Sequence, residues 1–477
     1  MLDLNSLKAK VDGLVRSHDL VFDGVFEAFT PWWGGDSSGC VFSPGQGGLV
    51  PHYPEPKAII GRTKWAIRTV LGYVPKELGE VGQGPKDTGV ASAVKVFVDV
   101  VSGGKPYFTE ADLPRVSGDK RKYRSELNAM REVGYEMLFE GYRSKEKLER
   151  LVDAYRKRRT EFYKLLTIPR FYLRAMGKTG EDPREVIRRA LLFQPMRPGF
   201  KIRVRVLSRD RRAGRLFATA MMVTLKYLGV GGAANRGFGR FRLLKVDYAA
   251  EGINTEVDIT RDDLYDVFKQ LGYEPKVNPR GRDPRFPRFP LPDEVKRVNG
   301  PVSAFINGRK YRARDVEGVL AAMGTATLKS TWKSYCNNLL GSGRISASRG
   351  YTRPSTNNLL GSGREYHTWV LGLPRKVGNT GYFVSQSKGK SRSPESQEEE
   401  GGRRQSYIVL SPTEGLGALL IPFYADDYPG IEHRDHGKPP QVVTVGRVTP
   451  DCEREKASRL VRDHIETALD WLQELLE

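Results

Sequence analysis

The stretch from Leu228 to Leu243, LGVGGAANRGFGRFRL, has the residue types and the spacing of a phosphate-binding loop. Two Gly–apolar–Gly triplets, separated by five residues, are formed by Gly229, Gly231, Gly237 and Gly239. Glycine allows a positive φ and carries no side chain, so the backbone can approach a ligand closely and point its N–H groups at phosphate oxygens. Arg236 and Arg240 flank such a contact, and we predict that both bind nucleic-acid phosphates.

The residues around this loop bear on three alternatives to a contact with nucleic-acid phosphates. A dinucleotide-binding GxGxxG loop follows a strand and precedes a helix, whereas here a helix is expected before the loop and a strand after it. The aromatic signature of an RRM requires an aromatic or apolar residue where Arg240 stands. A glycine-rich turn without any ligand stays open.

Two further groups of cations have a spacing that suits phosphate contacts. Lys64 and Arg68 lie four residues apart in an expected helix, on one face. Lys201, Arg203 and Arg205 alternate with apolar residues in an expected strand, so that one face of this strand is basic. The whole chain of 477 residues has a formal net charge of +21, which favours an anionic partner such as a nucleic acid.

Catalytic and metal-binding patterns are weak by comparison. Cleavage of RNA without a metal needs a general base and a general acid, for which His18, His52 and Asp36 are the candidates. These residues form no convergent motif, and Asp36 could equally cap a turn. The three cysteines form no CxxC pair and the six histidines form no HExxH motif. We therefore expect no enzymatic activity, no metal site and no cofactor.

The order of the expected elements indicates an α+β fold. A strand, a helix, two strands separated by a helical insertion at about 110–195, a second helix, the glycine-rich loop at 229–239 and a last strand give the order βαββαβ. This order is typical of ferredoxin-like (RRM-like) domains. We predict an N-terminal domain at 1–255, a Pro/Arg-rich linker region at 256–300, and a C-terminal domain at 301–477 that includes a mobile loop at about 385–404.

Two segments of the second half could contact nucleic acid or could have no ligand. Arg285, Phe286, Arg288 and Phe289 alternate charge and aromatic rings within the Pro-rich region, which suits either a grip on a strand or a plain tether. The octapeptide NNLLGSGR occurs at 337–344 and again at 357–364. It is either a duplicated RNA-contacting loop or a neutral duplication.

Together, these residues resemble the RAMP superfamily of RNA-binding CRISPR proteins, whose C-terminal glycine loop has the form G-h-G-x5-G-h-G. Other stretches resemble the large tandem-RAMP subunit of the type III-B (Cmr) effector complex. They are FTPWWGG at 29–35; Thr63, Lys64, Ala66, Ile67 and Arg68 of the first helix; VLGLPRK at 370–376; and RRQSYIVLS at 403–411. Trp65 stands where that family has a glycine.

The resemblance implies tandem ferredoxin-like domains in a non-catalytic subunit of antiviral defence. Such a subunit would contact the 3′ region of the guide RNA, help to capture single-stranded target RNA, and bind other Cmr subunits. The alternative is a RAMP-type endoribonuclease that processes guide RNA or cleaves target RNA. The glycine loop would serve RNA, neighbouring subunits or the packing of its own domain. Because no run of eighteen apolar residues occurs, we expect a cytoplasmic protein without a membrane partner.

Overall fold

We describe the chain from a computed structural model. The described residues are 18–34, 39–79, 92–145, 148–157, 160–178, 180–276, 287–328, 331, 370–371, 375–377, 380–384, 406–425, 431–434, 441–443, 462, 465–466 and 468–477. The chain divides into two compact units. Unit 1 comprises Met1–Gly134, Ser144–Pro279 and Leu291–Asp293, and unit 2 comprises Tyr135–Arg143, Arg280–Pro290 and Glu294–Glu477.

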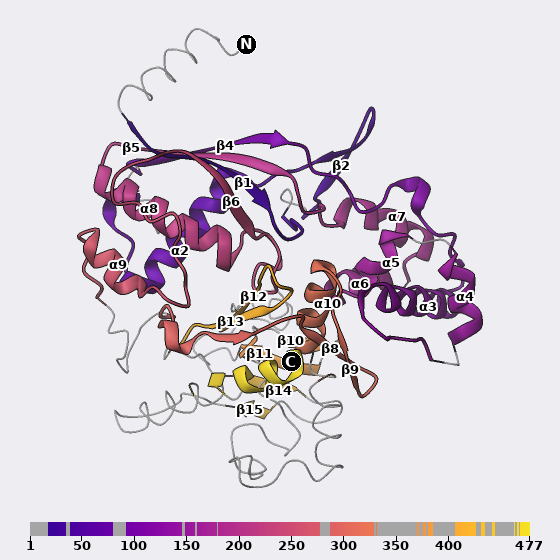
Figure 1. Cartoon of the computed structure of the whole chain (residues 1–477). Helices are drawn as coiled ribbons and strands as arrows, with labels where there is room; N and C mark the ends of the chain where they lie inside the picture. The colour runs from indigo at the N-terminus through magenta and orange to yellow at the C-terminus, as the bar shows by residue number, and fades with distance from the viewer. Residues whose placement is uncertain are drawn as a thin grey trace, which may run out of the picture. The chain divides into compact units, whose positions relative to one another are not determined.

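The centre of unit 1 is a four-stranded antiparallel sheet with the strand order β4-β5-β1-β6 (Figure 1). Its strands are β1 (Asp19–Ala28), β4 (Val94–Ser102), β5 (Lys201–Ser208) and β6 (Phe241–Ala249). Alternation produces the two faces of β5: Ile202, Val204 and Val206 are buried, and the basic residues between them point to the other face.

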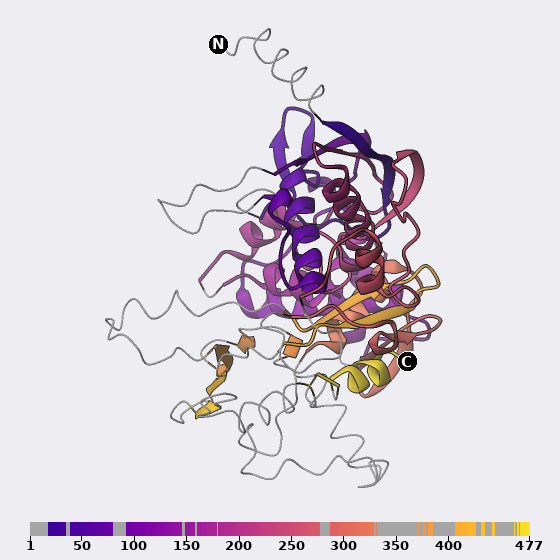
Figure 2. The ribbon, with the colours of Figure 1, turned by 90° about the vertical axis from the view of Figure 1, so that its left-hand side faces the viewer.

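Two helices cover the buried face of this sheet. They are α2 (Pro56–Leu71) and α8 (Arg211–Val223), which lie side by side in both views (Figures 1 and 2). Helix α2 has Pro56 in its first turn and ends at Gly72, whose φ of 80° permits its N–H to bond to the carbonyl of Arg68. Asp210 caps α8 by accepting from the N–H of Ala213.

The order of these elements along the chain is the βαββαβ order that the sequence predicts for the first domain. The predicted helical insertion between the second and third of these strands contains α3 (Lys120–Leu138), α4 (Glu149–Arg156), α5 (Glu161–Leu166), α6 (Pro169–Met176) and α7 (Pro183–Phe193). Phe108, Phe162 and Phe171 form a buried aromatic cluster in it, with ring centroids 5.0–6.3 Å apart.

Unit 1 also contains a hairpin and a further helix. The hairpin consists of β2 (Phe42–Gly45) and β3 (Gly48–Pro51). Helix α9 (Leu264–Gln270) buries Leu264, Tyr265 and Phe268, so unit 1 continues past residue 255 into the predicted linker region. Short 3-10 helices are η1 (Lys76–Leu78), η2 (Glu110–Asp112) and η5 (Pro292–Glu294).

The described strands of unit 2 form three separate antiparallel sheets. They are β12-β13-β7, β8-β9 and β10-β11-β14-β15. The strands are β7 (Lys296–Val298), β8 (Ser303–Ile306), β9 (Arg309–Arg312), β10 (Arg375–Val377), β11 (Thr380–Val384), β12 (Ile408–Pro412), β13 (Ala418–Pro422), β14 (Ile431–Arg434) and β15 (Gln441–Val443). The helix α10 (Val316–Ala326) packs on β8 and β12. These sheets do not confirm a second ferredoxin-like domain.

One interpretation of the Pro-rich region is wrong at the residues that the structure describes. Arg288 is 3% exposed, and its guanidinium makes two bonds to Glu294, one of them 2.6 Å long, with the ring of Tyr424 4.7 Å away. Phe289 is 1% exposed and packs against Phe423 at 5.5 Å. Both side chains therefore stabilise unit 2 and are not available to a nucleic acid.

Several other predicted features lie outside the described residues. They are Asp36, Arg285, Phe286, both copies of NNLLGSGR and the segment 385–404.

The substitution Arg288→Met should lower the free energy of unfolding by about 3 kcal/mol, because it leaves the mostly buried Glu294 carboxylate without its closest cation. Urea denaturation measures this change. As a control, Arg211→Met breaks an exposed ion pair with Asp19 and should cost at most about 1 kcal/mol. A loss for Arg288→Met no larger than for the control would argue against this assignment.

Candidate nucleic-acid interface

The glycine-rich loop joins the second helix of the unit 1 sheet to its last strand. Helix α8 ends in a π-helical turn, η4 (Thr224–Leu228), which closes with a 2.7 Å bond from the N–H of Gly229 to the carbonyl of Thr224. All four glycines of the predicted pattern have a positive φ: 66° at Gly229, 88° at Gly231, 92° at Gly237 and 66° at Gly239. Other residues adopt this conformation at a cost, so the spacing of the glycines follows the turns of the backbone.

Close approach also requires glycine at three of these positions. A Cβ atom on Gly229 would lie 1.7 Å from Nη1 of Arg240, and one on Gly239 would lie 2.0 Å from the carbonyl oxygen of Val230. A Cβ on Gly231 would lie 2.6 Å from the ring of Trp32. The loop is therefore folded tightly on itself and on the segment that follows β1.

The N–H groups that hold this loop in place donate to carbonyl oxygens of the chain. Val230 donates to Gly239 at 3.1 Å, and Gly239 donates to Pro31 at 2.9 Å. Gly232 donates to Trp33 at 2.5 Å. Because these donors are used inside unit 1, they are not directed at a phosphate, and of the roles that the resemblance allows they favour packing of the domain.

Arg240, which we predicted to bind RNA, is fully buried. Its Nη1 donates to the carbonyl of Phe238 and its Nη2 donates to the carbonyl of Ala234, both at 2.9 Å. Burial, and then the nearby Arg62, lower the pKa of Arg240 well below its usual value. Its position inside the loop means that Arg240 is not a phosphate contact; it holds the loop together.

Arg62 is a residue of this region that the sequence pattern did not single out. Its Nη2 donates to Oδ1 of Asn235 in the loop at 2.8 Å, and its guanidinium lies 4.2 Å from the ring of Trp65. Burial lowers the pKa of Arg62 to about 10, so it remains a cation at neutral pH. No local signal could reveal this contact, because Arg62 and Asn235 are 173 positions apart.

The predicted cations on α2 and on the loop lie on the side of the sheet that α2 covers. Lys64 donates to the carbonyl of Gly79 at 3.0 Å, and burial lowers its pKa. Arg68 is exposed one helical turn further along α2. Arg236 is half-buried, and its Nη1 donates to the carbonyl of Asn235 at 3.0 Å. Arg68 and Arg236 thus offer more accessible charge than Lys64.

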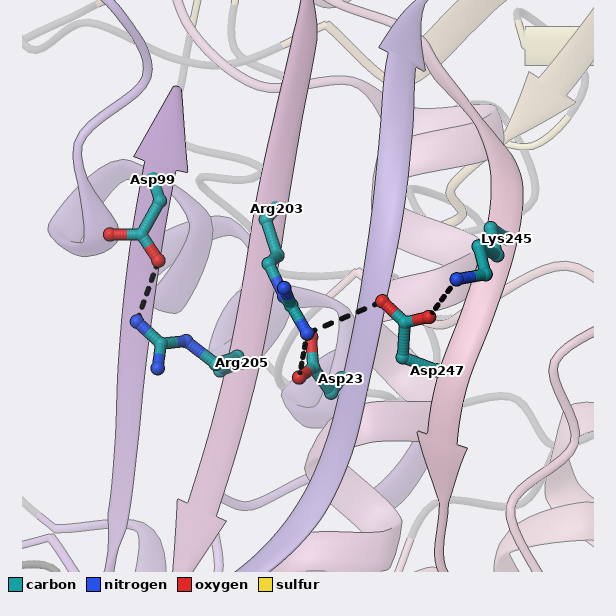
Figure 3. A network of polar contacts seen from close by, with 6 residues as sticks. All are labelled: Asp23, Asp99, Arg203, Arg205, Lys245 and Asp247. Atoms are coloured by element: carbon teal, nitrogen blue, oxygen red, sulfur yellow. Dashed lines mark hydrogen bonds and ion pairs between the residues drawn. The ribbon is translucent and has the colours of Figure 1, made fainter. Parts of the chain in front are cut away.

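The basic face of β5 is neutralised by acids from neighbouring strands, as Figure 3 shows. Arg203 makes two bonds to Asp23 of β1, at 2.6 and 2.7 Å, and lies 3.3 Å from Asp247 of β6. Hydrogen bonding to Asp23 raises the pKa of Arg203. Arg205 pairs with Asp99 of β4 at 2.6 Å. The basic face predicted for this strand is therefore paired with acids of the neighbouring strands in the sheet.

Two further lysines of this sheet are Lys245 and Lys201. Lys245 pairs with Asp247 at 2.5 Å, which is the main reason that the pKa of Asp247 is lowered. Lys201 lies at the start of β5 and is half-exposed; among the described residues it takes part in no ion pair. Lys201 therefore keeps its charge available, but on the sheet face opposite α2.

The candidate catalytic histidines lie near opposite ends of β1. His18 directly precedes β1 and is buried, whereas the carbonyl of His52 accepts a bond from the indole of Trp32, beyond the other end of the strand. Ten extended residues span roughly 30 Å, so the two imidazoles cannot act on one phosphodiester. His52 is hydrogen-bonded to the hydroxyl of Ser43. Among the described residues, no cluster of three potential metal ligands occurs.

The described part of the chain contains no helix that is both long and apolar enough to cross a membrane.

Most of the chain is similar in fold to solved structures of Cmr proteins. Cmr1 from Pyrococcus furiosus in its apo form is 15% identical, with 88% of this chain and 93% of that chain covered and a TM-score of 0.36. The type III-B Cmr-beta complex bound to cognate target RNA and AMPPnP in the presence of ssDNA contains a chain that is 13% identical, with coverages of 94% and 99% and a TM-score of 0.40.

A further structure of Cmr-beta, bound to cognate target RNA, contains a chain that is 12% identical, with coverages of 95% and 100% and a TM-score of 0.39. Neither a protein-family model nor a curated protein matches the sequence.

The substitution Gly239→Ala should lower the free energy of unfolding by about 3 kcal/mol, because strain at a positive φ is combined with a clash against a backbone carbonyl. Thermal and urea denaturation measure the loss. Gly199 is the matched control: its φ is 93°, and a Cβ there would meet no atom within 4 Å. Gly199→Ala should therefore cost only the backbone term of about 1–2 kcal/mol. Equal losses would mean that packing does not require Gly239.

Proposed function

We propose that this protein is a non-catalytic RNA-binding subunit of a type III-B CRISPR (Cmr) effector complex. In this role it contacts the 3′ region of the guide RNA and helps to capture single-stranded target RNA. The observation that carries the proposal is the place of the glycine-rich loop. The loop follows α8 and precedes β6 of a βαββαβ sheet, and all four of its patterned glycines have a positive φ. This is the arrangement that the resemblance to RAMP domains implies.

The charge distribution supports an RNA ligand for this domain. The chain has a net charge of +21, while the exposed sheet face carries paired charges of both signs. Arg68, Arg236, Lys201 and the less accessible Lys64 are the predicted contacts that lie outside these pairs. Cations of this kind neutralise phosphates without reading bases, which suits a complex in which guide–target pairing reads the sequence.

Three further features belong to the same proposal. Residues 301–477 would form a second ferredoxin-like domain, as the tandem-RAMP resemblance implies. Other Cmr subunits would be the protein partners, and the cytoplasm would be the location.

The separation of His18 and His52, which lie near opposite ends of β1, supports a subunit that does not cleave RNA.

The double substitution Arg68→Gln/Arg236→Gln should weaken binding of single-stranded RNA by roughly tenfold at low salt. It should also reduce the slope of log K against log salt concentration by about 1.4, because each lost phosphate contact on a single strand contributes about 0.7. Fluorescence anisotropy with labelled RNA across a salt series measures both quantities.

The matched control is Arg211→Gln/Arg242→Gln, which removes the same charge from arginines that are paired with Asp19 and Glu27. It should change affinity less than the first pair does. If the unmodified protein fails to bind RNA in this assay, the proposal is wrong.

Purified protein should leave labelled single-stranded RNA intact, with and without divalent metal, because the two candidate histidines do not converge. Denaturing gels after incubation provide the readout. Discrete cleavage that disappears in His18→Ala or His52→Ala would instead establish a RAMP-type endoribonuclease. A matched single-stranded DNA in the same assay tests whether the ligand is RNA.

A further inference from the structure

Helix α6 of the insertion carries two exposed arginines, one helical turn apart, that form no ion pair among the described residues. Arg170 and Arg174 are both exposed and lie four residues apart, so they share one face of the helix. Among the described residues, no carboxylate forms an ion pair with either of them. On the next helix, α7, Arg188 pairs with Glu185 at 2.8 Å and Arg189 pairs with Glu181 at 3.0 Å.

Two guanidinium groups one turn apart repel each other, and this repulsion is not compensated within α6. Partial burial, and then the charge of Arg174, lower the pKa of Arg170. Like charges at this spacing destabilise a helix by a few tenths of a kcal/mol. Such an arrangement is stabilised when an anion binds to both groups.

Aromatic rings beneath the two arginines orient their guanidinium groups. Cζ of Arg170 lies 5.2 Å from the ring centroid of Trp33, and Cζ of Arg174 lies 4.5 Å from that of Phe193. Trp33 is itself fixed, because its ring packs against Phe238 of the glycine loop at 5.1 Å. A stacked guanidinium keeps its N–H edge free for a second ligand, and its planar fork matches phosphate oxygens.

The backbone of the glycine loop passes close to Arg170. A Cβ on Gly232 would lie 3.8 Å from Nη1 of Arg170 and 2.5 Å from the carbonyl oxygen of Trp33, so the backbone runs next to the arginine without a side chain between them. Gly231 is exposed beside it. Leu173 lies between the two arginines in sequence and is 65% exposed, which offers an apolar contact beside the charges.

We propose that this α6 patch, formed by Arg170, Leu173, Arg174, Gly231 and Gly232, binds the sugar-phosphate backbone of single-stranded RNA. The inference rests on the proposed function and deepens it, because it adds a contact surface contributed by the helical insertion. RNA is favoured over an acidic protein since the patch joins oriented guanidinium groups, whose planar fork matches phosphate oxygens, to an exposed apolar side chain. Positive charge that follows the backbone, together with contributions from arginine guanidinium groups, is how proteins hold single strands.

The test compares full-length Arg170→Gln/Arg174→Gln with Arg188→Gln/Arg189→Gln, which removes two paired arginines from the neighbouring helix. The probe is a labelled uridine homopolymer of about 20 nucleotides, titrated between about 50 and 200 mM salt, where phosphate contacts dominate the affinity. The first pair should weaken binding roughly tenfold at low salt and reduce the salt slope by about 1.4. The second pair should leave both quantities close to those of the unmodified protein.

A third variant separates charge from geometry. Arg170→Lys/Arg174→Lys keeps both charges but loses the planar fork, so its affinity should lie between those of the unmodified protein and the glutamine variant, with the salt slope retained. Thermal unfolding of all variants checks that the fold is intact.

Several outcomes overturn the inference, and they are distinguishable. If Arg68→Gln/Arg236→Gln weakens RNA binding while Arg170→Gln/Arg174→Gln does not, this patch is no RNA site and the proposed function stands. If both α6 and α7 variants lose affinity equally, only overall charge matters. Labelled polyglutamate, titrated against the same variants, serves as the acidic-protein probe. If Arg170→Gln/Arg174→Gln weakens its binding but not that of RNA, the patch binds an acidic protein. If the unmodified protein binds no RNA, both proposals fail.

Discussion

The buried guanidinium of Arg240 is the constraint on which the glycine-rich loop depends. A charge removed from water must be compensated by acceptors, and here carbonyls of Phe238 and Ala234 in the loop provide them. The loop must therefore wrap around the side chain. Gly229 has to lack a Cβ because that atom would occupy the space of the guanidinium. The glycine pattern and the buried arginine are thus two parts of one packing solution.

The loop, held together from inside, also packs against other elements of unit 1. Asn235 accepts a bond from Arg62 of α2, and Phe238 packs on Trp33 after β1. Trp33 in turn lies under Arg170 of α6. The helical insertion, the first helix and the glycine loop therefore meet in unit 1 through aromatic and guanidinium contacts. The α6 patch, the candidate RNA surface, lies where these elements meet.

The sheet shows why a count of cations on one strand is a poor guide to a binding surface. The strand β5 carries alternating basic residues, but β1 and β4 place Asp23 and Asp99 beside Arg203 and Arg205. Cross-strand pairing of these arginines with aspartates largely neutralises the charge of this sheet face. By contrast, α6 lacks acidic residues, and no acid of a neighbouring described element pairs with its arginines. Positive charge is therefore available where the local density of carboxylates is low.

The sequence by itself determined the order of elements in unit 1, the helical insertion and the positions of the positive-φ glycines, because alternation, helical periodicity and backbone freedom are local properties. Only the tertiary structure decided which cations are accessible. Arg203 meets a carboxylate 180 positions away, and Arg240 is fully buried in a loop whose backbone N–H at Arg240 donates to the hydroxyl of Thr30, 210 positions away. A signal for α6 was present, since no acidic residue occurs between Glu161 and Glu181. Its contact with Trp33 arises only when segments distant in sequence fold together.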